Sequence, residues 1–209
     1  LDRGYETTFK LKPTEEFAFG IAMTPCVLRE GKLKSHILIN ASIIIPLENM
    51  EDENFGSALH TLAHECAHVE ISSRFDQSFP DTLLRKSIND LHKAIRFEII
   101  QSCWDEYAAT WIAAPFGRDP TSDYEQTFAL VLEQSRKKAN SLVSAYRLHA
   151  DIEKVTAEVY KVYADLMKFA CYHLGNMHGK NLVLSDLPVT QAALEGHWFA
   201  PYFERIAIA

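Results

Sequence analysis

The sequence lacks the features of a disulfide-stabilised, membrane-spanning or nucleic-acid-binding protein. Its four cysteines form no CxxC pair and no spacing typical of a disulfide framework, which favours a reducing compartment, and we expect the cytoplasm. No hydrophobic run approaches the length that crosses a bilayer, and the opening LDRGYETTFK has no signal-peptide character. Basic residues are in the minority, so the formal net charge is -7. Because an acidic chain repels phosphate backbones, we expect neither a nucleic-acid partner nor a membrane partner.

The residues that are present suffice for one sizeable core. Of 209 residues, 47% are hydrophobic, and the charged content of 23% is ordinary for a folded domain. Residues 1–56 are expected to be mostly extended, and the β-branched stretches KSHILIN and ASIIIP (residues 34–46) predict one long strand or two short ones. Helical periodicity begins at residue 56. The predicted fold class is therefore α+β, with a small N-terminal β-sheet and a mainly helical C-terminal half.

Helical segments are expected from apolar periodicity and from residues that start or stop helices. They cover residues 56–72, 80–114, 122–174 with a break at 149–151, and 186–205. Gly175, Asn176 and Gly179 are expected to end the third of these. We expect residues 1–120 to form the core, and residues 121–209 to be a helical segment packed on it, as a separate unit or within the same domain.

The stretch ALHTLAHECAHVEI, residues 58–71, carries three histidines at steps of four. On a helix with about 100° per residue, His60 and His68 lie about 40° to either side of His64. Two imidazoles at positions i and i+4 can direct their ring nitrogens toward one point, where a zinc ion can bind. Glu65 lies about 100° round from His64, so it can reach a water bound to that ion and remove its proton.

Residues 64–68, HECAH, therefore form an HExxH motif on a predicted helix. A chain of this composition would contain about 0.03 such matches by chance. The alternative, a histidine-rich helix whose rings bond to backbone carbonyls, is therefore less favoured. His60 lies one turn earlier and is interpreted as a histidine that supports a metal ligand or lines the rim of the site, or as a solvated one. Leu62 and Cys66 fall on the opposite face, and Cys66 is expected to be a buried small hydrophobe.

A catalytic zinc ion needs a third protein ligand, which must come from another element. Glu106 is the strongest candidate, because its helical neighbours are uncharged and a carboxylate there needs compensation. Asp105 and Glu98 are alternatives, as is His92 if the site uses three histidines. All three acids could instead be surface groups on a solvated helix.

A carboxylate is also expected to orient one of the ligating imidazoles. Asp105 is one candidate for that role and Glu70 is the other.

HECAH, followed 38 residues after His68 by EYAATWIAAP, resembles the ImmA/IrrE-type metallopeptidases. Their second motif is approximately E-x-x-A-N-x-F-A, which Glu106, Ala109 and Ala113 match, whereas Thr110 replaces the Asn and Ile112 the Phe. The resemblance covers about residues 35–115. It implies a zincin-like metallopeptidase core, a glutamate as third zinc ligand, and a zinc-dependent endopeptidase that often cleaves a repressor or another regulatory protein.

The leading functional hypothesis is a zinc endopeptidase with a protein or peptide substrate, in which His64, His68 and Glu106 hold Zn²⁺ and Glu65 is the general base. Tyr107 and His60 are candidate donors to the oxyanion. HILINASIIIP could pair with an extended substrate or could be a plain core strand. The alternatives are a catalytically silent zincin-like domain that acts as a protein-binding or sensing module, and a structural helical domain without metal.

Overall fold

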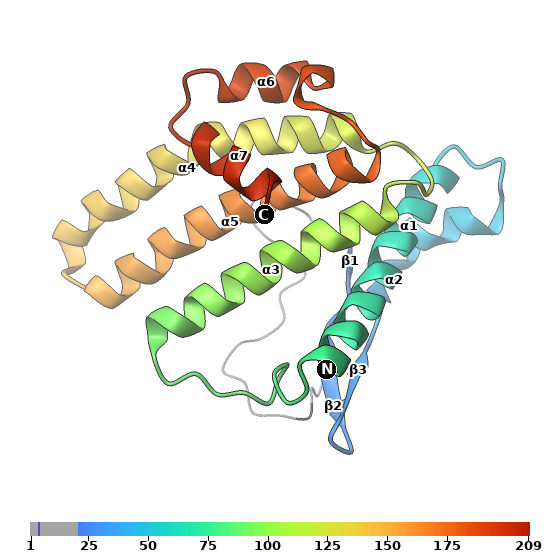
Figure 1. The fold of residues 1–209 in the computed structure, drawn as a ribbon, viewed down its shortest axis with the longest axis horizontal. Helices are drawn as coiled ribbons and strands as arrows, with labels where there is room; N and C mark the ends of the chain where they lie inside the picture. Colours follow the sequence, from blue (N-terminus) through green and yellow to red (C-terminus); the bar gives the residue numbers. More distant parts are fainter. Residues whose placement is uncertain (1–3, 5–20) are drawn as a thin grey trace.

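The structure is a computed structural model that describes residue 4 and residues 21–209, and its fold class is α+β as predicted (Figure 1). Two small antiparallel sheets come first. Strand β1 (Ala22–Met23) pairs with β4 (Leu38–Ile39), and β2 (Cys26–Arg29) pairs with β3 (Lys32–Ser35) in a hairpin. The extended structure expected for residues 5–20 lies outside the described residues.

The strand predicted for ASIIIP is wrong, because these residues are helical. Helix α1 (Ala41–Ile44) is followed directly by the 3₁₀ helix η1 (Ile45–Glu48). The side-chain oxygen of Asn40 accepts a hydrogen bond from the Ser42 N–H at 3.1 Å, and Pro46 stands in the first turn of η1. This cap and this proline start helices, and they outweigh the preference of the isoleucines for a strand.

The remaining elements are long helices and a short C-terminal set. They are α2 (Phe55–Ser78), α3 (Leu91–Ala113), α4 (Thr121–His149), α5 (Ile152–Gly179), the 3₁₀ helix η2 (Leu184–Asp186), α6 (Pro188–Leu194) and α7 (Ala200–Ala207). The predicted break at 149–151 is confirmed: Ala150 is left-handed at φ 54°, and Asp151 caps α5 by accepting from the Lys154 N–H at 2.9 Å. None of the helices among the described residues is both long enough and apolar enough to cross a membrane.

Helix α3 begins at Leu91, not at residue 80 as predicted. Asp81 and Leu84 have positive φ angles, 64° and 60°, which a right-handed helix cannot contain. The helix starts where the side chain of Asp90 accepts a hydrogen bond from the Lys93 N–H at 2.9 Å. The apolar periodicity of residues 80–90 therefore reflects a connecting loop whose leucines are half-buried, not a helical turn.

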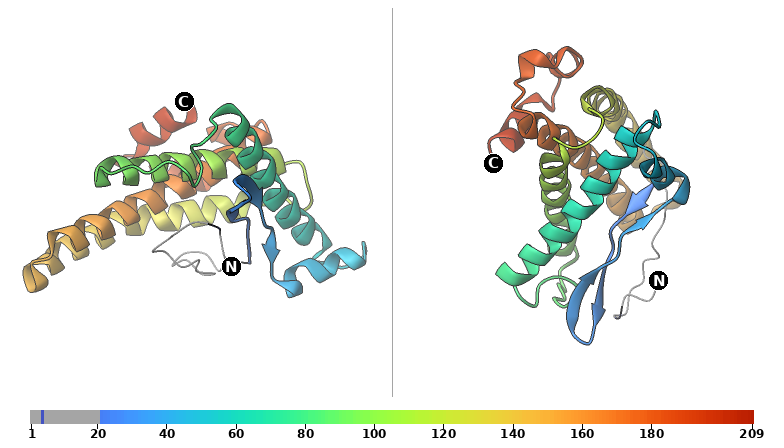
Figure 2. Two further views of the ribbon diagram at one scale, coloured as in Figure 1. Left: turned by 90° about the horizontal axis from the view of Figure 1, so that it is seen from below. Right: turned by 90° about the vertical axis from the view of Figure 1, so that its right-hand side faces the viewer.

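The long helices pack in a layered arrangement that Figures 1 and 2 show from three sides. Helices α4 and α5 form an antiparallel hairpin, α3 lies along α5, and α2 packs across α3. The β2–β3 hairpin runs along α2, while α6 and α7 cover α4 and α5 (Figure 2). The main hydrophobic core lies between α4, α5 and these last helices, around Phe128, Leu166 and Leu174. The metal-ligand candidates of α2 and α3 are therefore supported from one side by α5.

The contact between α3 and α5 depends on two glycines that were expected to end the helix. A Cβ at Gly175 would lie 2.0 Å from Thr110 Oγ1 and 2.3 Å from the Tyr107 carbonyl oxygen, and one at Gly179 would lie 2.6 Å from Ala114 Cβ. These glycines therefore allow close backbone approach inside a helix that continues to Gly179. The approach fixes the segment of α3 that carries Glu106.

Candidate metal centre

Helix α2 buries the histidine side of its surface, which corrects the orientation expected from the sequence. The side chains that it buries are Ala58, Glu65, Ala67, His68 and Ile71. Cys66 is exposed, so its predicted burial is wrong, and Leu62 is only half-buried. The reason is the packing partner: Ala67 and Ile71 form a small apolar cluster with Ala109 of α3, and this contact turns the helix so that His68 faces α3.

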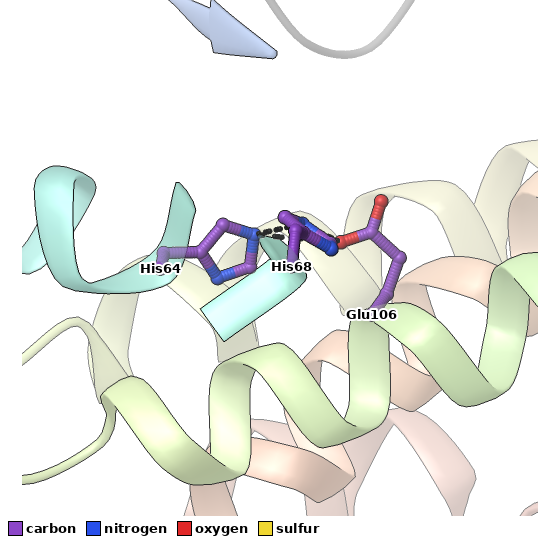
Figure 3. A group of neighbouring side chains, drawn as sticks. All are labelled: His64, His68 and Glu106. Carbon is purple, nitrogen blue, oxygen red and sulfur yellow. Dashed lines mark hydrogen bonds and ion pairs between the residues drawn. The ribbon is translucent and has the colours of Figure 1, made fainter. Parts of the chain in front are cut away.

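His64, His68 and Glu106 form one compact group between α2 and α3. Figure 3 shows the two imidazole rings side by side on α2 and the Glu106 carboxylate reaching toward them from α3. Nε2 of His64 lies 3.0 Å from Nε2 of His68, and Glu106 Oε2 lies 3.4 Å from each of these nitrogens. The three potential ligand atoms all lie within 4.8 Å of one another, so the group could hold a metal ion.

The electrostatics of this group fit a cation. Burial alone would raise the pKa of Glu106, but its contacts with His64 and His68 outweigh burial and hold the pKa well below its usual value. Glu106 Oε2 is buried and accepts no geometrically sound hydrogen bond from the described residues. An ionised, buried oxygen without a hydrogen-bond donor, facing two imidazole nitrogens, is an arrangement that a bound divalent metal ion would satisfy.

Of the candidates for the third ligand, Glu106 is the one that the structure groups with His64 and His68. Asp105 lies outside the group but contacts the far side of the His68 ring, with Oδ2 3.0 Å from Nδ1. Glu98 and His92 are exposed and do not belong to the group. Glu70 is also exposed and pairs with Arg74 on its own helix. Of the acids considered for orienting an imidazole, Asp105 is therefore the one in position to do so.

His60 and Tyr107 each have other partners. His60 Nδ1 lies 3.2 Å from the carbonyl oxygen of Phe116, so Nδ1 carries the proton, and Nε2 faces the Tyr124 hydroxyl at 3.4 Å. Burial, only partly offset by the Phe116 carbonyl, lowers the pKa of His60. The Tyr107 hydroxyl lies 2.8 Å from Nδ1 of His178. His60 is thus a neighbour of the metal group, not a member of it.

Two residues that the sequence did not single out complete the surroundings. The ring of Tyr172, on α5, stacks on His64 with centroids 5.9 Å apart and an interplanar angle of 21°. Thr24, just after β1, donates a hydrogen bond from Oγ1 to Glu65 Oε2 at 2.6 Å. Tyr172 looks like a core aromatic in the helical pattern and Thr24 belongs to no motif, so neither could have been identified without the fold.

An apolar groove of about 810 Å³ lies close to the metal group but does not contain it. Its walls come from the C-terminal half of α2 and from α3, with Phe75, Trp104 and Trp111 among the lining residues. Neither the histidines of the metal group nor Glu106 line this groove. The chemistry-bearing residues therefore lie outside this concave surface.

Comparisons with protein-family models, with curated proteins and with solved structures find no match for this chain. The function is therefore inferred from the residues of the site and from their arrangement.

Proposed function

We propose that this protein is a zinc-dependent endopeptidase with a zincin-like core. The observation that carries the proposal is the convergence of His64, His68 and Glu106 on one point, with Glu65 between the two histidines on the same helix. Two imidazoles and one carboxylate leave a fourth position open on a tetrahedral ion, which is the pattern of catalytic zinc sites. The resemblance of HECAH and EYAATWIAAP to the ImmA/IrrE-type metallopeptidases supports the same function.

Each residue then has a defined task. His64, His68 and Glu106 would hold the ion, and the chemistry that zinc supplies in such a donor set is activation of water and polarisation of a carbonyl. The Glu65 carboxylate accepts a proton from the attacking water and passes it to the nitrogen of the leaving amine. The Asp105 carboxylate lies 3.0 Å from Nδ1 of His68 and favours the tautomer with its proton on Nδ1, so that Nε2 is the nitrogen that would bind the cation.

The proposed substrate is a peptide segment of another protein, in the cytoplasm, and a regulatory protein is the class that the family resemblance suggests. The acidic charge of the chain, -7, argues against a nucleic-acid substrate. A catalytically silent zincin-like binding module is the competing function. An intact glutamate at position 65 favours the enzyme, because a module without catalysis has no need of a base beside the metal.

The test combines metal analysis with cleavage of a peptide library by the zinc-loaded protein. We expect about one zinc per chain, loss of zinc in Glu106→Ala, and retained zinc without cleavage in Glu65→Gln. Glu70→Gln is the matched control, because Glu70 lies on the same helix but is exposed and pairs with Arg74. Zinc binding without any cleavage by the unaltered protein would favour the binding module, and absence of zinc binding would overturn both functions.

A further inference from the structure

Thr24 donates a side-chain hydrogen bond to Glu65, the residue that the proposed function makes the general base. The two residues are 41 positions apart, and the Thr24 hydroxyl lies 2.6 Å from Glu65 Oε2 and 3.3 Å from the Glu65 carbonyl oxygen. A hydroxyl has one proton to donate, and the shorter distance assigns it to the carboxylate. A hydrogen bond to an ionised carboxylate is among the stronger ones in proteins.

The two oxygens of the Glu65 carboxylate are therefore in different states. Oε2 is occupied by the threonine hydroxyl, whereas Oε1 accepts no hydrogen bond from the residues that the structure describes. Glu65 as a whole is 6% exposed, and Oε1 is the carboxylate oxygen that the described residues leave without a hydrogen-bond donor.

The backbone around Thr24 is well suited to hold this hydroxyl in place. Pro25 follows it, which restricts the backbone of Thr24 to extended conformations, and a β-branched side chain has few χ1 rotamers. The segment is also held between the two sheets, because the Pro25 carbonyl accepts a hydrogen bond from the His36 N–H at 3.1 Å. Val27, three residues on, is fully buried. The hydroxyl thus has a fixed direction before any substrate binds.

We propose that Thr24 is a positioning residue that selects the catalytic oxygen of Glu65. By occupying Oε2, it fixes the carboxylate so that Oε1 is the oxygen that accepts the proton of the attacking water. This role depends on the proposed endopeptidase function, and it adds a residue from the connection between β1 and β2 to a site built otherwise from α2 and α3. Loss of the hydroxyl leaves the metal ligands in place but leaves the base free to rotate.

The kinetic test compares Thr24→Val, which has the same shape without the hydroxyl, with Thr24→Ser, which keeps it. Because a misplaced catalytic group costs up to about 100-fold in rate, we expect Thr24→Val to lower kcat roughly 10- to 100-fold, with KM and zinc content unchanged. Thr24→Ser should recover most of that loss. Thr24→Ala is a second hydroxyl-free variant in case Val disturbs the sheet. Unchanged kcat in both hydroxyl-free variants, with an active parent protein, would overturn the inference and leave the proposed function standing.

A second measurement does not depend on activity. Thermal unfolding of the metal-free protein is compared for Thr24→Val, Glu65→Met and the double variant, since methionine fills the glutamate volume without accepting the hydrogen bond. We expect Thr24→Val to lower the melting temperature by about 2–4 °C in the parent and clearly less in the Glu65→Met background. Equal shifts in both backgrounds would show that the two side chains are not coupled and would overturn the inference. If the two side chains are coupled but the zinc-loaded protein cleaves no peptide, the positioning role is overturned together with the proposed function.

Discussion

Asp105 Oδ2 lies 3.0 Å from Nδ1 of His68, on the opposite edge of the ring from the nitrogen that faces Glu106. Two consecutive acids of α3 therefore contact the two nitrogens of a single imidazole. In the neutral ring, Nδ1 carries the proton toward Asp105 and Nε2 presents a lone pair toward Glu106 and His64. When a metal ion displaces the proton from Nε2, the Asp105 carboxylate favours keeping the remaining proton on Nδ1.

Removal of the Asp105 carboxylate should weaken metal binding. We expect Asp105→Ala to lower zinc affinity about 10- to 100-fold, because the His68 ring loses the partner that fixes its tautomer and orientation. Competition with a fluorescent chelator measures the affinity. Glu98→Ala is the matched control, since it removes an equal charge from an exposed position on the same helix. Equal affinities of the two variants would contradict the role assigned to Asp105.

The stability of the metal-free protein should fall as the pH rises above neutrality. Burial by itself would lower the pKa of His68, but Asp105 and Glu106 outweigh it and raise the pKa to about 10. The unfolded value is near 6.5, so the stabilisation is fully present below pH 6.5 and is lost between about pH 6.5 and 10.

Urea unfolding of the metal-free protein across this range measures the effect. His68→Gln should flatten the profile, and zinc should do the same because a bound ion replaces the proton. Zinc affinity should rise over the same pH interval. A metal-free protein whose stability does not change between pH 6.5 and 10 would show that His68 is not held in its charged form.

A methyl group at Gly175 should disturb the metal centre through the backbone. A Cβ there would meet Thr110 and the Tyr107 carbonyl, so we expect Gly175→Ala to cost about 1–3 kcal/mol of stability. Because Tyr107 is adjacent to Glu106, zinc affinity should also fall. Gly179→Ala is the matched comparison, since its clash lies against Trp111 and Ala114, farther along α3. We expect Gly179→Ala to destabilise the protein to a similar extent but to lower zinc affinity less than Gly175→Ala does. A larger loss of zinc affinity in Gly179→Ala would contradict the prediction.

Loss of the α3 cap should reduce stability without altering the site. Asp90 accepts a hydrogen bond from the Lys93 N–H, so Asp90→Ala should cost about 1 kcal/mol, seen as a lower melting temperature. Asp90→Asn keeps a capping oxygen and should restore most of the loss. Zinc stoichiometry should stay at the parent value in both variants, because the cap lies near the opposite end of α3 from Glu106. Equal melting temperatures for Asp90→Ala and the parent would argue against the cap.

Local features of the sequence determined the position of the HExxH helix, the break between α4 and α5, and the pairing of His64 with His68. Helical periodicity and capping residues act within a few positions, so their effects can be read directly from neighbouring residues. The same local reading failed for ASIIIP and for residues 80–90. In ASIIIP, the side-chain cap from Asn40 starts a helix where a strand was predicted. In residues 80–90, the left-handed residues Asp81 and Leu84 prevent the predicted helix.

Only the tertiary structure decided which of Glu98, Asp105, Glu106 and His92 approaches the histidines. The choice depends on how α3 is rotated against α2, which is set by the Ala67–Ile71–Ala109 contact on one side and by Gly175 of α5 on the other. The contact of Thr24 with Glu65 spans 41 residues and arises from the docking of the sheets on α2. Such relationships depend on packing between distant segments, and no pattern of neighbouring residues contains them.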